Sequence, residues 1–366
     1  MSALFNQGAA SAPSSTTGDI SKDVEVAQNL LPTDSISALA WSPTHDFLAV
    51  AAWDKAVRIY EISGGSVNGK WSIPCAEVPL CVAWSEDGTK IAAGGNEGSI
   101  FFVDLSTQQA GGEAKPIPDW KPHQAGVKGI CFFKRDNKDW LATGSWDKTV
   151  QFWDFTSTTA CTKGITCAER VYSMDTRSNL LVVATAERHI HVINLGNSLD
   201  SIYKTIQSPL KWQTRVVSCF SDATGFAVGS IEGRCAIQYV EDKDTSLNFS
   251  FKCHRQQDPT SRDIAKVYSV NAISFHPHHG TFSTAGSDGT FHFWDKDAKH
   301  RLKGYPDVGG SITATGFSRD GNIFAYAISY DWSKGYAANN QTYPIKLKLH
   351  PVAGDECKPR PGNKKR

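Results

Sequence analysis

A glycine-rich stretch early in the chain is the best match to nucleotide chemistry. Residues 64–71 read GGSVNGKW, which has the GxxxxGK spacing of a phosphate-binding loop. Such a loop places a Ser or Thr hydroxyl directly after the lysine to hold Mg²⁺, but Trp71 occupies that position and no helix is predicted to follow. We therefore interpret the stretch as a connection between two sheets.

Three histidines stand close together in the segment HPHHG. His276, His278 and His279 lie in a predicted turn, and no cysteine or carboxylate cluster accompanies them at the spacing of a metal site. The chain also has no GxSxG elbow and no carboxylate pair that stands out for acid–base catalysis. These residues predict a non-enzymatic protein that uses no cofactor and no metal.

A set of polar residues between 123 and 153 has the types and spacing of a structural hydrogen-bond network. His123 precedes a predicted strand, Thr143 lies in the next strand, Asp147 in the following turn and Trp153 at the end of a third strand. In a buried network each donor has a partner, so the set stabilises a sheet. We interpret His123 as a structural histidine and not as a catalyst.

Short apolar runs separated by polar turns extend over most of the chain. The clearest example, residues 126–155, contains the runs ICFF, WLATGS and TVQFW, whose length and β-branched or aromatic content predict antiparallel strands. Equivalent positions in successive copies are about 42 to 55 residues apart. The copies are Ser35–Ile62, Pro79–Leu105, Gly126–Phe155, Arg170–Leu195, Val216–Val240, Val270–Lys296 and Ile312–Leu349.

Seven such copies predict an all-β fold, a seven-bladed WD40 β-propeller. A ring must close or leave exposed sheet edges, and the last copy supplies only three strands. We predict that residues 23–29 add the outer strand of the last blade. The domain then covers residues 23–352, between a disordered leader at 1–22 and a basic flexible tail at 353–366.

An insertion before the sixth copy concentrates positive charge. The formal net charge of the whole chain is only +1, so attraction of an acidic peptide or a phosphate backbone would depend on local patches. An alternative is that these cations are solvated and balanced by nearby Asp residues. The basic residues around the fifth and sixth copies are Arg234, Lys252, His254, Arg255, Arg262, Lys266, Lys296, Lys299, His300, Arg301 and Lys303.

The sixth copy is predicted to have an incomplete polar network. It keeps Thr284, Asp288 and Trp294, but Lys266 or a neighbouring residue stands where a histidine is expected. Trp294 would then be freer to contact a partner, together with Phe251 as a second aromatic anchor.

Composition favours an intracellular protein. Nine cysteines lie mostly inside apolar runs without a CxxC pair, which is typical of a reducing compartment. No apolar run approaches the length of a membrane span, so we expect no membrane contact.

The segments FKCHR, VYSVNAISFHP, TFSTAGSDG and FWDKDAK resemble the signature of the mRNA-export WD-repeat nucleoporin family and of its sister, the mitotic-checkpoint propeller. The run LATGSWDKTVQFWD, the YDWSKG loop and the closing KPRP are similar to the export member. The resemblance extends over about residues 23–360.

This resemblance implies an adaptor of the nuclear pore in poly(A) mRNA export that shuttles between nucleus and cytoplasm. Its implied partners are the GLEBS segment of a GLFG-repeat nucleoporin, bound one to one, and mRNP or single-stranded RNA. A spindle-checkpoint scaffold that binds checkpoint kinases is the alternative.

The resemblance also implies roles for individual residues. Arg234, Lys252, His254 and Arg255 would hold acidic residues of the GLEBS segment. A groove for nucleic acid or its mimics would be formed by Phe251, Trp294, Lys296 and Lys299, the last of these standing where the family pattern leads us to expect Arg.

Overall fold

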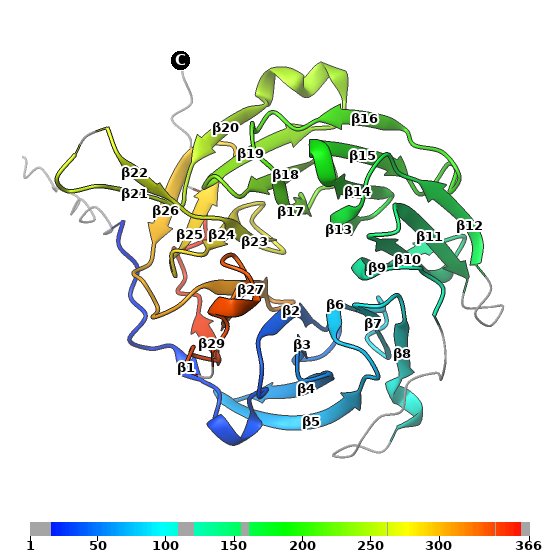
Figure 1. Cartoon of the computed structure of the whole chain (residues 1–366), viewed down its shortest axis with the longest axis horizontal. Coiled ribbons are helices and arrows are strands. Elements are labelled where there is room, and N and C mark those ends of the chain that lie inside the picture. The colour runs from blue at the N-terminus through cyan, green and yellow to red at the C-terminus, as the bar shows by residue number, and fades with distance from the viewer. Residues whose placement is uncertain (1–15, 109–120, 155–160, 262, 341, 360–366) are drawn as a thin grey trace, which may run out of the picture.

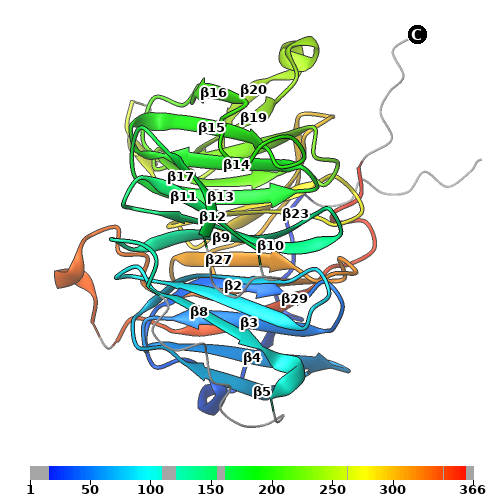
Figure 2. The ribbon, with the colours of Figure 1, turned by 90° about the vertical axis from the view of Figure 1, so that its right-hand side faces the viewer.

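The computed structural model describes residues 16–108, 121–154, 161–261, 263–340 and 342–359. Seven antiparallel sheets stand around a central axis and form a closed seven-bladed β-propeller (Figure 1). Viewed from the side, the sheets form a thick disc, and a loop carrying the short helix η5 (Tyr336–Ala338) extends beyond one face (Figure 2).

The first three blades follow the order of the sequence. Blade 2 has three strands within the described residues, and blades 1 and 3 have four. Their elements are β2 (Ile36–Trp41), β3 (Phe47–Ala52), β4 (Ala56–Ser63) and β5 (Ser66–Pro74); β6 (Pro79–Trp84), β7 (Lys90–Gly95), β8 (Ile100–Asp104) and η2 (Leu105–Thr107); β9 (Val127–Arg135), β10 (Lys138–Ser145), β11 (Thr149–Asp154) and β12 (Cys161–Thr166).

The next three blades each have four strands, and the insertion adds a separate hairpin between blades 5 and 6. The elements are β13 (Val171–Arg177), β14 (Leu180–Thr185), η3 (Ala186–Arg188), β15 (His189–Asn194) and β16 (Lys204–Gln207); β17 (Thr214–Cys219), β18 (Gly225–Ser230), β19 (Arg234–Tyr239), η4 (Asp242–Leu247) and β20 (Phe249–Lys252); the hairpin β21 (Arg255–Gln257) and β22 (Ala265–Val267); β23 (Val270–Phe275), β24 (Phe282–Gly286), β25 (Phe291–Asp295) and β26 (His300–Gly304).

Blade 7 joins the two ends of the chain. It contains β27 (Ile312–Phe317), β28 (Ile323–Ile328), β29 (Lys346–Pro351) and, as its outer strand, β1 (Val24–Glu25). Val24 pairs with Leu349, and the backbone N–H of Val26 donates to the carbonyl of Leu347 over 2.9 Å. The short helix η1 (Gln28–Leu30) then leads into blade 1.

The hydrophobic core lies between neighbouring blades. Strand β3 shows the principle, because successive side chains of a strand point to opposite faces of its sheet. Leu48 and Val50 pack in a cluster with blade 7, whereas Ala49 and Ala51 pack in a cluster with blade 2. Both faces of the sheet are therefore buried, and each blade is stabilised by its neighbours.

The structure differs from the predicted boundaries at both ends. Residues 16–22 of the predicted leader lie along blade 6, where Gly18 donates to the carbonyl of Gly304 over 2.9 Å. In the predicted tail, Glu356 and Cys357 are buried, and Thr281 donates to the carbonyl of Cys357 over 2.7 Å. The N-terminal segment finds a backbone partner at the edge strand β26, and the C-terminal segment finds a side-chain partner in blade 6, contacts that composition does not reveal. Residues 1–15 and 360–366 lie outside the described residues.

Within the described residues, no helix is long and apolar enough to cross a membrane. The same residues contain no group of three or more His, Cys, Asp or Glu side chains placed to hold a metal ion.

Candidate partner-binding site at blades 5 and 6

Three basic residues lie at one end of blade 5 and at the start of the adjoining hairpin. Arg234 begins β19 and Lys252 ends β20, and the two residues are paired in register. Arg255 opens the β21–β22 hairpin, which projects outward from the ring (Figure 1). We call Arg234, Lys252 and Arg255 the cationic cluster.

Glu232 lies inside the cationic cluster. Its Oε2 atom is 3.8 Å from Nε of Arg234 and 3.5 Å from Nη2 of Arg255, so one carboxylate serves two guanidinium groups. The exposed side chain of Lys252 forms no ion pair within the described residues. The cluster therefore keeps an excess of positive charge that a carboxylate-bearing segment would neutralise.

The turn that carries Glu232 requires a glycine. Gly233 has φ of +66°, and a Cβ atom there would lie 2.3 Å from the carbonyl oxygen of His254. This close approach fixes the turn of blade 5 against the chain segment that enters the hairpin. Sequence reasoning did not single out Glu232, although its position two residues before Arg234 was a visible signal.

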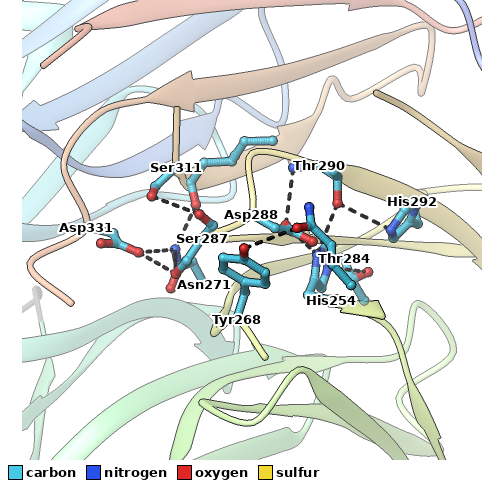
Figure 3. Close-up of polar contacts among 12 residues, drawn as sticks. His254, Tyr268, Asn271, Thr284, Ser287, Asp288, Thr290, His292, Ser311 and Asp331 are labelled. Carbon is cyan, nitrogen blue, oxygen red and sulfur yellow. Dashed lines mark hydrogen bonds and ion pairs between the residues drawn. The ribbon is translucent and has the colours of Figure 1, made fainter. Parts of the chain in front are cut away.

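His254 is not part of the accessible surface, contrary to its predicted role in peptide binding. Its side chain is fully buried, with Nδ1 2.9 Å from Oδ1 of Asp288 and Nε2 3.0 Å from Oγ1 of Thr284 (Figure 3). Nε1 of Trp294 donates to the same Thr284 hydroxyl over 2.9 Å. Both ring nitrogens of His254 are occupied inside the protein, which leaves none for a partner.

The predicted gap in the blade 6 network is therefore wrong. His254 supplies the missing histidine, and the hairpin of residues 255–267 separates it from the inner strand of its blade. The usual spacing before the inner strand β23 had placed Lys266 or a neighbouring residue at the histidine position. Lys266 is instead exposed on β22. Burial opposes ionisation of Asp288, but the hydrogen bond and charge of His254, together with hydrogen bonds from Thr290, lower the pKa of Asp288.

Blade 3 contains the corresponding network at the four residues singled out in the sequence. Nδ1 of His123 is 2.9 Å from Asp147, and Nε2 is 2.8 Å from the hydroxyl of Thr143. Nε1 of Trp153 donates to that hydroxyl over 3.0 Å. Burial lowers the pKa of His123 despite the nearby carboxylate, so the histidine is a structural element of its blade.

The four residues predicted to form a nucleic-acid groove are spread across blades 5 and 6. The rings of Phe251 and Trp294 are 4.5 Å apart and half-buried between the two sheets. Lys296 is buried, with its ammonium 2.8 Å from Asp297. The exposed Lys299 lies with its ammonium 4.9 Å from the ring of Phe249, at the start of β20.

Lys299 and the cationic cluster belong to two separate surfaces. Strand β20 runs from Phe249, next to Lys299, to Lys252 in the cationic cluster. Three residues of strand span about 10 Å, so Lys299 and the cationic cluster lie at opposite ends of the outer strand. Phe251 and Trp294 lie between them.

Known proteins resemble this chain over nearly its whole length. A family model described as WD domain, G-beta repeat matches residues 28–61, 74–104, 114–154 and 264–295. The mRNA export factor GLE2 of Chaetomium thermophilum is 56% identical and covers 100% of both chains. The Poly(A)+ RNA export protein of Schizosaccharomyces pombe is 51% identical over 98% of each chain.

More distant relatives also match nearly the whole chain. Protein Rae1 of Drosophila melanogaster is 41% identical, covering 92% of this chain and 96% of its own. A solved structure of U3-55K superposes with a TM-score of 0.74 at 15% identity, covering 90% of this chain and 98% of its own, which shows a common fold. The relatives over the full chain and the seven blades together show that this protein belongs to the family of WD-repeat mRNA export factors that includes GLE2 and Rae1.

Proposed function

We propose that the protein is a non-enzymatic adaptor of the nuclear pore, which holds the acidic GLEBS segment of a GLFG-repeat nucleoporin at the cationic cluster. Relatives named for mRNA export share nearly all of the chain, and this supports a role in mRNA export. The adaptor would act in the nucleus and at the pore, bind its partner one to one, and associate with mRNP.

The observation that carries the proposal is the charge imbalance at blade 5. Arg234 and Arg255 share the single carboxylate of Glu232, and Lys252 has no acidic partner within the described residues. A guanidinium group can hold a carboxylate with two parallel hydrogen bonds, so a Glu-rich segment suits this cluster.

The adjacent hairpin offers apolar contacts to the same segment. Ile264 and Val267 are 56% and 47% exposed, so the hairpin presents two large apolar side chains to a partner. Val267 pairs in register with Arg255, so an apolar and a cationic side chain are available side by side. A partner that combines acidic and apolar residues would therefore gain from both.

The proposal is tested by calorimetry with a GLEBS peptide. The double variant Arg234→Glu and Lys252→Glu is expected to weaken binding by a few kcal/mol, because like charges would then face each other across the interface. Lys243→Glu is the matched control, since Lys243 is exposed on η4 in the connection from β19 to β20 of the same blade. Unchanged affinity in the double variant would reject the site.

A further inference from the structure

The central channel of the ring has a volume of about 1270 Å³ and is lined by the inner strands of all seven blades. Two cationic side chains enter it at the same end. Lys128 is the second residue of β9 in blade 3, and Arg215 is the second residue of β17 in blade 5. Both strands are innermost and run in the same direction through the disc, so both residues line one mouth of the channel.

Both side chains reach backbone carbonyls of other blades. The ammonium of Lys128 donates to the carbonyl of Leu80 in blade 2 over 3.1 Å. The guanidinium of Arg215 donates to the carbonyl of Asp331, next to blade 7, over 3.4 Å. Neither side chain forms an ion pair within the described residues, and a guanidinium carries five N–H donors and an ammonium three. Donors therefore remain for a ligand in the channel.

Two of the carboxylates that line the channel, Asp331 and Asp175, are held by hydrogen bonds to other residues. Asp331 accepts hydrogen bonds from Ser287 and, over 3.1 Å, from Asn271 (Figure 3). It also accepts one from the backbone of Ser333 over 3.1 Å. Burial lowers the pKa of Arg215, and the negative charge of Asp331 partly offsets this effect although the two side chains form no ion pair.

Asp175 lies further along the channel. It accepts a hydrogen bond from the backbone of Cys219 over 2.7 Å, and Cys219 is four residues beyond Arg215 on β17. Four residues of strand correspond to about 13 Å, so Asp175 does not neutralise the cations at the mouth.

The two cations also disfavour each other. Burial, and after it the charge of Arg215, lower the pKa of Lys128 to about 8. Bringing two like charges into one protein-lined space costs free energy, and an anion placed between them would offset that cost.

We propose that this mouth of the channel binds a small diphosphate anion through Lys128 and Arg215. Two cationic groups match the charge of a diphosphate better than that of a monoanion. Trp146, which is 37% exposed, lines the same mouth and offers a ring face to a nucleobase. Inorganic pyrophosphate and a nucleoside diphosphate are the two sources of this chemistry.

Titration of the full chain with pyrophosphate and with ADP, followed by calorimetry and by phosphorus NMR, tests the proposal. Both ligands are expected to bind. Tighter binding of ADP than of pyrophosphate would show that the base contacts Trp146. Lys128→Met and Arg215→Gln are each expected to weaken binding about tenfold or more, since hydrogen bonds to charged groups contribute on this scale. Lys243→Met, on the outside of the ring, should retain the affinity.

Two further measurements separate this site from others. Lys128→Arg keeps the charge and should restore most of the binding lost in Lys128→Met, which distinguishes anion binding from a folding defect. Arg234→Glu with Lys252→Glu should leave pyrophosphate binding intact, and Lys128→Met should leave GLEBS binding intact. Absence of binding at about 5 mM of either diphosphate, or binding of single-stranded RNA alone, would overturn the proposal.

Discussion

The Nδ1 atom of His350 lies 2.6 Å from a carboxylate oxygen of Asp23, although 327 residues separate the two in sequence. The other ring nitrogen lies 3.2 Å from Glu356, and Tyr326 donates to the second oxygen of Asp23. A buried polar cluster thus joins the N-terminal segment, the last strand and the C-terminal segment. The ring is closed by charge as well as by strand pairing.

This cluster predicts a loss of stability at alkaline pH. Burial lowers the pKa of His350, but hydrogen bonds to Asp23 and Glu356 outweigh it and raise the pKa to about 9. The ordinary value in an unfolded chain is about 6.5, so the contribution is complete below about pH 6.5 and is lost as pH rises through 9.

We expect His350→Gln to lower the free energy of unfolding by about 3 kcal/mol near pH 6 and by clearly less near pH 10. Urea unfolding at the two pH values measures the difference. His45→Gln is the control, because His45 is exposed and forms no ion pair within the described chain. An equal loss at both pH values would contradict the charged role of His350.

The closing strand predicts a position-dependent effect of proline. Val26→Pro removes the N–H that donates to Leu347, and we expect a loss of about 2 kcal/mol in the free energy of unfolding. Ala27→Pro should be close to neutral, because Ala27 already has φ of −58°. Thermal unfolding of both variants measures this, and equal effects would show that β1 does not hold the seam.

The two equivalent histidine networks predict matched losses of stability. His123→Ala and His254→Ala each remove a buried ring that bridges a Thr and an Asp, which should cost about 2 to 4 kcal/mol. Unfolding by urea measures the loss, and GLEBS affinity below the transition should stay unchanged. A His254→Ala variant that stays stable but binds GLEBS more weakly would instead show that His254 takes part in partner binding.

The shared carboxylate predicts that one substitution strengthens binding. Glu232→Gln removes the negative charge between Arg234 and Arg255, so an acidic peptide should associate several-fold faster at low salt. Stopped-flow association at low and high salt measures the effect, which screening should abolish. Glu241→Gln, two residues beyond the end of β19 and just before η4, should change little. Slower association in Glu232→Gln would mean that Glu232 mainly orients the arginines.

Much of the architecture could be predicted from the sequence, because strand patterns and turns are local. Alternating apolar runs, WDK and SDG turns and repeat spacing are all contained within about 45 residues, which is why seven blades could be counted. The polar network of blade 3 was equally accessible, since His123, Thr143, Asp147 and Trp153 stand at regular positions within one copy.

Tertiary structure decided what depends on contacts between copies. The insertion of residues 255–267 moved the structural histidine of blade 6 back to His254, and spacing alone could not reveal the displacement. The sharing of Glu232 by Arg234 and Arg255, and the meeting of Lys128 and Arg215 at one mouth, depend on how strands pair and how blades curve around the axis. A strand pattern determines which face of a sheet a side chain points to, but only the closed ring determines what lies opposite.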